Sequence, residues 1–391
     1  MKKLFFLLLS IFALNANAQN DEVALEPVKA DPGVATMMWV YINMPSYENE
    51  LRAVNVDIQF PDGFTVGTTA QEYGDGCKWD YDFEEAGTAT NWSCSGSKKT
   101  DNGTYYHFTV YANTESTPFH GKEGRLIQLK VKTPSVAGVY PVKVLASTYA
   151  AKNEVDADNL TWDAAQTSYV VVGEPTGASI AMEGTIPSFV NDALASEAAI
   201  TTLDLSNVTV SNGIFTYVDG RNVIAPSAEV KSDVAYFHAA GANVYSSVCL
   251  PFDAQVKNAY TLSGVEGDYA TFAAVAPGVA LAANTPAIVG GEISVEAQDV
   301  VLKGVQQETK TSGCYLKADK FLSVNGSAVI PALRGWWDVS SSVKGFVLDG
   351  ETAITGLNAD GTQQIYNVSG IKQAKAQRGV NIVNGKKVVV K

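Results

Sequence analysis

Residues 124–147 read GRLIQLKVKTPSVAGVYPVKVLAS, and this stretch predicts two β-strands joined by a turn. Ile127, Leu129 and Val131 alternate with polar or charged residues, as in a strand with one buried and one wet face. The alternation returns over Tyr140–Ala146, after a break that contains proline and glycine. Two half-buried strands need a second sheet to cover them. We therefore expect the N-terminal half of the chain to wrap around this pair.

The rest of the chain predicts an all-β protein. In residues 51–60, Val54, Val56, Ile58 and Phe60 point one way and the intervening polar residues the other. Elsewhere, strand-length apolar runs are separated by turn signals, and the chain holds 33 glycines. We expect an N-terminal jelly-roll sandwich, a second β-sandwich and a short C-terminal β-meander.

The first residues, MKKLFFLLLSIFALNANAQ, predict a secretory signal peptide over residues 1–18. Two lysines precede an apolar run, and small residues then lead to a cleavage point after about Ala18. That run is too short to remain across a bilayer. No later stretch is long and apolar enough for a membrane helix, so we expect a secreted protein with no transmembrane segment.

Composition and motifs exclude several classes of function. The formal net charge of -13 argues against nucleic acid and anionic lipid as partners. His107, His120 and His238 lie far apart in sequence, and no hydrolase, metalloprotease or phosphate-loop motif is present. We expect a monomeric protein that is not an enzyme and has no cofactor. A hydrolase stays an alternative because carboxylates are plentiful.

Four cysteines lack the spacing of a zinc site, so no metal is expected. Cys77 and Cys94 flank one irregular region, and we expect them to form a disulfide in the exported protein. Cys249 and Cys314 are either buried thiols or a second pair.

Breaks in the pattern divide the chain into consecutive parts. After the signal peptide we expect a β-sandwich over residues 21–173, then a linker and small β segment over residues 174–240. A second β-sandwich over residues 241–356 and a C-terminal β-hairpin tail over residues 357–391 complete the chain. Within the linker segment, Phe189–Ile200 is the one candidate for a short helix.

Residues 21–173 contain, in this order, the segments VALEPVKADPGVATMMWVYINMP, LRAVNVDIQFPDGF, GKEGRLIQLKVKT and AGVYPVKVLAS. This order of segments resembles a cohesin domain. Cohesins bind dockerin domains, and the related jelly-roll modules bind polysaccharides. The resemblance therefore implies a cohesin-like, non-catalytic binding module. Residues 71–101 form a long insert relative to the cohesin pattern.

That insert holds the candidate ligand-binding residues. In CKWDYDFEE, aromatic residues alternate with charged ones, so a strand here would have one aromatic face. Further aromatic residues and a histidine follow on the non-core phase of the next strand. We take the candidate ligand-binding set to be Trp79, Tyr81, Trp92, Tyr105 and His107. The alternative is that the aromatic rings fill the core.

The C-terminal tail, QIYNVSGIKQAKAQRGVNIVNGKKVVVK, predicts a β-hairpin around Asn384-Gly385, with Ile365–Val368 pairing beside it. It resembles the C-terminal sorting region of proteins exported by the type IX secretion system. The alternative is a meander that completes the second domain. The resemblance implies delivery to the outside or the outer cell surface of a Gram-negative bacterium.

These observations lead to two main hypotheses of function. The first is a secreted or cell-surface protein that binds polysaccharide through its N-terminal module. The alternative is a cohesin-type scaffold or adhesin that binds a surface or dockerin-like protein. Sugar binding predicts coplanar exposed aromatic rings on one face, whereas protein binding predicts a flat patch of mixed polar and apolar character.

Overall fold

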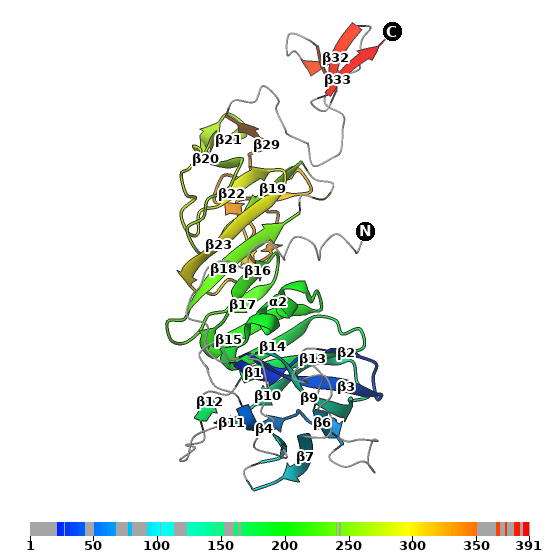
Figure 1. Cartoon of the computed structure of the whole chain (residues 1–391). Coiled ribbons are helices and arrows are strands. Elements are labelled where there is room, and N and C mark those ends of the chain that lie inside the picture. The colour runs from blue at the N-terminus through cyan, green and yellow to red at the C-terminus, as the bar shows by residue number, and fades with distance from the viewer. Residues whose placement is uncertain are drawn as a thin grey trace. The chain divides into compact units, whose positions relative to one another are not determined.

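The structure is a computed structural model, and among the residues that it describes the regular secondary structure is all β-strand apart from one short helix (Figure 1). The described residues are 22–26, 28–43, 51–67, 77–79, 92–101, 103–112, 123–145, 147–151, 160–162, 166–239, 241, 244–349, 365–367, 372–373, 379–383 and 386–390. The chain divides into two compact units, the first made of Met1–Thr216, Val223–Val234 and Ala297–Leu302 and the second of Tyr217–Asn222, Ala235–Glu296 and Lys303–Lys391. The expected all-β class is confirmed.

Two sheets form the sandwich of the first unit. The first sheet has the order β1-β3-β9-β5, with β6 also paired to β9. Its strands are β1 (Glu22–Leu25), β3 (Ala35–Asn43), β9 (Glu123–Lys132), β5 (Thr65–Val66) and β6 (Cys77–Trp79). The second sheet has the order β12-β11-β4-β10-β13-β14-β15-β17, with β8 on β4, β7 on β8 and β2 on β13. Its strands are β2 (Val28–Ala30), β4 (Leu51–Gln59), β7 (Trp92–Lys99), β8 (Tyr105–Ala112), β10 (Gly138–Val144), β11 (Ser147–Ala151), β12 (Leu160–Trp162), β13 (Gln166–Val172), β14 (Ala178–Ile186), β15 (Ile200–Ser211) and β17 (Asn222–Ile224).

The two strands predicted in residues 124–147 are present as β9 and β10, and each belongs to a different sheet. The proline-containing turn between them therefore crosses from one sheet to the other instead of closing a hairpin. Thr133 fixes this crossing, because its hydroxyl donates to the carbonyl of Asp31 at 2.7 Å. Buried side chains from both strands contribute to one core, as expected for a pair that organises a sandwich.

A β-bulge in the β3–β9 pair changes the expected alternation. Val40 pairs with Ile127 and Tyr41 pairs with Arg125, so Leu126 is the extra residue. Leu126 and Ile127 are consequently both buried. The core is completed from the second sheet, where Val54, Val56 and Ile58 of β4 are fully buried as the alternation predicts.

A parallel pair follows the sandwich strands. Strands β14 and β15 are parallel, and the helix α2 (Ser188–Ser196) forms part of the connection that parallel strands require. The helix expected over Phe189–Ile200 is present, and it begins at Ser188 and ends at Ser196. The three-stranded sheet β16-β18-β23 comprises β16 (Ile214–Val218), β18 (Lys231–His238) and β23 (Ile293–Val301).

The second unit contains several small sheets. The largest has the order β19-β22-β20-β21-β29, from β19 (Tyr245–Val248), β22 (Ala287–Gly290), β20 (Ala259–Glu266), β21 (Tyr269–Ala274) and β29 (Gly345–Leu348). Two others have the orders β24-β27 and β26-β25-β28. Their strands are β24 (Glu308–Lys310), β27 (Ala328–Ile330), β26 (Lys320–Ser323), β25 (Cys314–Lys317) and β28 (Trp336–Trp337).

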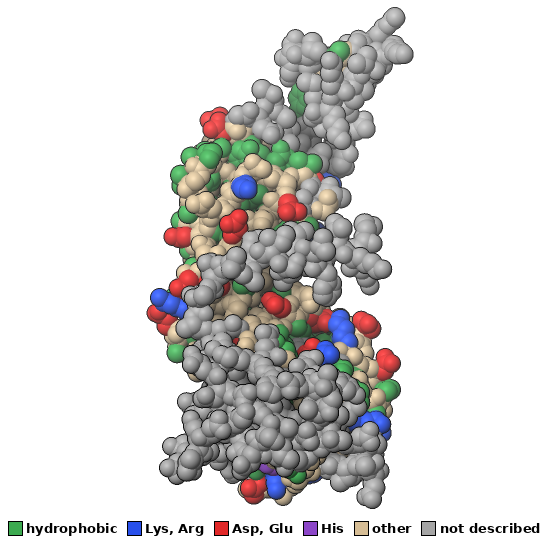
Figure 2. Space-filling model, in the orientation of Figure 1, with side chains coloured by type: hydrophobic (Ala, Val, Ile, Leu, Met, Phe, Trp, Pro, Cys, Tyr) green, Lys and Arg blue, Asp and Glu red, His purple; other side chains and the backbone are tan. Residues whose placement is uncertain are grey.

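An aromatic cluster forms the core of this unit. Phe272 contacts Phe346 and Trp337 with ring centroids at 6.2 and 5.2 Å, and Phe321 lies against all three. Trp337 is buried and Trp336 is partly exposed, as expected for neighbours on a strand. Figure 2 shows exposed hydrophobic side chains over β20 and β21, and these include Leu262 and Val265.

The tail strands pair among themselves in the order β31-β30-β32-β33, from β30 (Ile365–Asn367), β31 (Lys372–Gln373), β32 (Gly379–Val383) and β33 (Lys386–Val390). Val383 pairs with Lys386 across the predicted turn, and Ile365 pairs with Val383. The pairing predicted for the tail is therefore confirmed. The turn residues Asn384 and Gly385 lie outside the described residues.

Candidate binding face

Two neighbouring strands of the second sheet bring polar side chains together on its outer surface. Antiparallel pairing of β4 and β8 places Asn55 opposite Thr109 and Asp57 opposite His107. The alternate residues of both strands, such as Val56 and Phe108, are buried in the core. Because side chains alternate along a strand, the polar set must lie on the other face. We call Asn55, Asp57, Tyr105, His107, Thr109 and Tyr111 the binding face.

A chain of hydrogen bonds joins four of these side chains. His107 Nδ1 lies 2.7 Å from Asp57 Oδ1, and His107 Nε2 lies 3.1 Å from Thr109 Oγ1. The Thr109 hydroxyl donates to Asn55 Oδ1 at 2.8 Å. The hydrogen-bonded series therefore runs Asp57–His107–Thr109–Asn55 across the two strands.

This network orders the surface more than it stabilises the fold. The side chains of His107 and Asp57 remain 35% and 29% exposed. Even where such an exposed pair is charged, it contributes at most about 1 kcal/mol to the free energy of unfolding. What the network does provide is a fixed pattern of donors and acceptors on an open β-surface.

Two tyrosines on β8 add aromatic character at either side of the network. Tyr111 is 41% exposed, and Tyr105 is partly exposed. The pKa of Tyr105 is raised, first by desolvation and then by the negative charge of Asp101, with which its hydroxyl forms a hydrogen bond. The face therefore mixes charged, hydroxyl, amide and aromatic groups.

The predicted ligand residues fall in three places. Tyr105 and His107 lie two residues apart on β8 and belong to the binding face. Trp79 is on β6 in the first sheet, where its backbone pairs with Ile127, and Trp92 is on β7 in the second sheet. Tyr81 and the side chains of both tryptophans lie outside the described residues, so the proposed aromatic platform stays a prediction.

The sequence pattern placed Asn55, Asp57 and Tyr111 off the core face of their strands, but it did not join them into a site and did not single out Thr109. The missing information was the register between β4 and β8, which are separated by more than 40 residues of sequence. The sequence of each strand predicts which of its residues face solvent. It does not predict which residue of the other strand lies opposite.

The cysteines occupy both units. Cys94 on β7 is partly buried against the core of the first unit, and Cys77 on β6 pairs with Leu129 through its backbone. The predicted disulfide would link the two sheets and stays a prediction. Cys249 and Cys314 are free thiols, and burial raises the pKa of each.

The described ranges hold neither a metal-binding cluster nor a membrane-spanning helix. Those residues contain no group of three or more His, Cys, Asp or Glu side chains arranged to hold a metal ion. In that part of the chain, no helix has the length and apolar character needed to cross a membrane.

No family model matches the sequence, and no curated protein matches it. Solved structures with a likeness include the cohesin module of a family 33 glycoside hydrolase from Clostridium perfringens, at 11% identity and a TM-score of 0.28, over 40% of this chain and 96% of that one. A second is a type I cohesin–dockerin complex from Clostridium thermocellum, at 13% identity and a TM-score of 0.29, over 39% of this chain and 99% of that one. A third is a non-cellulosomal cohesin from Archaeoglobus fulgidus, at 9% identity and a TM-score of 0.25, over 39% of this chain and 91% of that one. The fold assignment rests on the strand order and register given above.

Proposed function

We propose that the first unit is a non-catalytic module that binds a protein partner through the binding face. The observation that supports this is the hydrogen-bonded series Asp57–His107–Thr109–Asn55 on an open sheet, with Tyr111 exposed beside it. A flat surface of mixed polar and aromatic character is the pattern expected for protein recognition. Two carboxylates facing each other across a cleft, as a hydrolase needs, are absent from this face.

Pre-ordered side chains favour binding because less conformational entropy is lost when the partner arrives. Tyrosine suits such a surface, since it offers a large contact area and a hydroxyl group while having few rotatable bonds. The resemblance of residues 21–173 to cohesins points to a dockerin-like domain as the partner. The predicted signal peptide and the likeness of the tail to a sorting region support secretion, with delivery to the exterior or outer surface of a Gram-negative cell.

The proposal is tested by measuring the affinity of the mature chain for a panel of isolated dockerin domains. Tyr111→Ala and Asp57→Ala should each weaken binding about tenfold or more. Gln128→Ala, on β9 of the other sheet, is the matched control and should leave the affinity unchanged. Equal affinities for all three variants, or no binding of any dockerin, would refute the proposal.

Polysaccharide binding is the second candidate, and the concentration of aromatic residues between Trp79 and Trp92 favours it. Each ring that stacks on a sugar could contribute about 1–2 kcal/mol to the binding free energy. Trp79→Ala should then weaken binding to a glycan array hit about tenfold while the melting temperature stays constant. If the Trp79 ring lies in the core, Trp79→Ala should instead lower the free energy of unfolding by about 3–5 kcal/mol. That result would contradict the platform hypothesis.

A further inference from the structure

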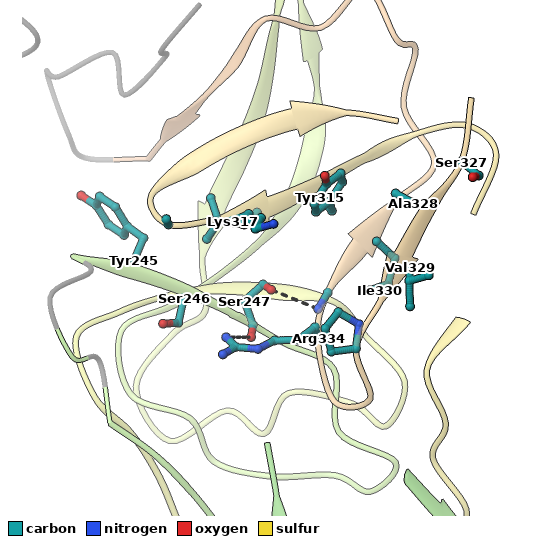
Figure 3. Close-up of a pocket in the computed structure, with 14 residues that line it drawn as sticks. Tyr245, Ser246, Ser247, Tyr315, Lys317, Ser327, Ala328, Val329, Ile330 and Arg334 are labelled. Carbon is teal, nitrogen blue, oxygen red and sulfur yellow. Dashed lines mark hydrogen bonds between the residues drawn. The ribbon is translucent and has the colours of Figure 1, made fainter. Parts of the chain in front are cut away.

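The second unit contains a pocket that the proposed function does not use. It has a volume of about 390 Å³ and lies between the edge strand β19, the hairpin β25–β26 and the strand β27 (Figure 3). Small-molecule sites in proteins commonly have volumes of about 300–1,000 Å³. The pocket is therefore large enough for one small ring-shaped ligand with its substituents.

The charges around this pocket differ from those of the chain as a whole. The sequence holds 41 acidic and 28 basic residues. None of the 14 lining residues is acidic, and the two charged ones are Lys317 and Arg334. Asp219 and Asp319 bond to the lining residues Arg334 and Tyr245 but do not line the pocket themselves. The charged side chains of the lining are therefore basic, which favours an anionic ligand there.

The two basic side chains have different roles. Arg334 donates to Asp219 Oδ2 at 2.7 Å and to the carbonyl of Ser247 at 3.2 Å, so its charge is already compensated. Lys317 is exposed and takes part in none of the ion pairs among the residues that the structure describes. The positive charge left for a ligand is therefore that of Lys317.

The hairpin β25–β26 presents an aromatic ring together with that charge. Tyr315 and Lys317 are two residues apart on β25, so both side chains lie on the same face of the strand. Tyr245 and Ser327 also line the pocket, from β19 and from the loop before β27. Figure 3 shows Tyr315 and Lys317 beside each other, with Tyr245 and Ser327 at opposite ends of the group. An aromatic ring, hydroxyl groups and a cation are the groups needed to bind a sugar that carries a carboxylate.

The walls of the pocket are fixed in position. The backbone N–H of Tyr245 donates to Asp319 Oδ1 at 2.6 Å, which ties the tip of the β25–β26 hairpin to β19. On the other side, the N–H of Gly335 donates to Ser247 Oγ at 3.2 Å. The outward N–H of Tyr245 and the carbonyl of Ser247 are thus occupied, which disfavours a peptide that adds a strand to this edge.

The turn of the β25–β26 hairpin forms one edge of the pocket. Lys317 pairs with Lys320, so the turn consists of Ala318 and Asp319, which have φ of 49° and 63°. Positive φ at both residues is what a tight two-residue hairpin turn requires. Ala318 lines the pocket, so this turn fixes the position of that edge.

We propose that this pocket binds a uronic acid, either free or at the end of an oligosaccharide. The carboxylate pairs with Lys317 Nζ, the sugar ring packs against a tyrosine, and its hydroxyl groups bond to the serine and backbone groups of the wall. The site is in the second unit and does not depend on the binding face of the first.

The test is a titration of the full mature chain with D-galacturonate, D-galactose and acetate, followed by calorimetry or NMR. Galacturonate should bind at least tenfold more tightly than galactose, which lacks the carboxylate, and than acetate, which lacks the ring. Lys317→Met should lower the affinity for galacturonate about tenfold, to that for galactose. Lys320→Met is the matched control, because Lys320 pairs with Lys317 across the same hairpin and lies outside the lining, and it should change nothing.

Three results would overturn the proposal: equal affinity for galacturonate and galactose, unchanged galacturonate binding in Lys317→Met, or no binding of any probe at millimolar concentration. Dockerin binding should be the same in Lys317→Met as in the parent chain. A failure of the pocket proposal is therefore distinguishable from a failure of the binding-face proposal.

Discussion

The carboxylate of Glu22 caps the helix α2 from 166 positions away in the sequence: its oxygens accept from the backbone N–H and the hydroxyl of Ser188 at 2.8 and 3.0 Å. The helix has no local side-chain cap, because Pro187 occupies its N-cap position. Glu22 is fully buried and also accepts from Asn212 Nδ2 at 2.9 Å. The first strand thus satisfies donors that the helix leaves open.

Replacing Glu22 should destabilise the first unit strongly. Glu22→Ala leaves several buried donors without an acceptor, and we expect a loss of about 3 kcal/mol in the free energy of unfolding, measured by urea denaturation. Glu22→Gln keeps an acceptor and should cost less. Glu26→Gln alters a partly exposed pair with Arg125 and serves as control, with an expected loss below about 1 kcal/mol. A Glu22→Ala variant as stable as the control would contradict the capping role.

The elements that the sequence predicted well are those with a local pattern. The alternation in residues 51–60 identified the buried face of β4, and Asn384-Gly385 located the tail hairpin, because both signals depend on neighbouring residues. The separation of β9 and β10 into two sheets, the bulge at Leu126 and the Glu22 cap each depend on distant partners. The sequence did not predict the binding face for the same reason, since the register between β4 and β8 is a tertiary property.

The stability of the second unit should depend on pH through His238. Burial, and then the charge of Arg334, lowers the pKa of His238 below its ordinary value of 6.5. The unfolded chain therefore binds more protons than the folded chain below that pH, and stability rises with pH. The stability contributed by neutral His238 is fully present above pH 6.5. It is lost as the pH falls through the pKa of His238 in the folded protein. His238→Gln should flatten the urea-denaturation profile below pH 6.5, and parallel profiles for the two proteins would contradict this.

Thiol counting tests the disulfide. Unfolded, unreduced mature protein should label at Cys249 and Cys314 alone, because Cys77 and Cys94 are paired. In the chain-entropy model, a disulfide that closes a loop of about 17 residues stabilises the folded protein by about 3 kcal/mol. In the folded protein, the fully buried Cys314 should react most slowly, since burial raises its pKa and blocks access. Labelling of all four cysteines in the unfolded chain would exclude the bond.

The strain at Ala318 predicts a stabilising substitution. A left-handed conformation costs a non-glycine residue about 1–2 kcal/mol, and glycine adopts it freely at some cost in chain entropy. Ala318→Gly should therefore raise the unfolding free energy of the second unit by up to about 1 kcal/mol. Ala328→Gly, on the other wall of the pocket in an ordinary strand, should lower it. Equal destabilisation by both would show that the turn is not strained.

Truncation of the tail tests whether it directs the protein to the cell surface. Its strands pair only with one another among the described residues, so truncation after Asp360 should leave the melting transition of the remaining chain unchanged. Binding of dockerin and of galacturonate should also persist, because neither site includes a tail residue. In the native host, the truncated protein should accumulate inside the cell envelope, whereas the full chain reaches the outer surface, as fractionation and surface proteolysis would show. Normal surface delivery of the truncated chain would refute the sorting role. A large fall in the melting temperature would instead mean that the tail completes the second domain.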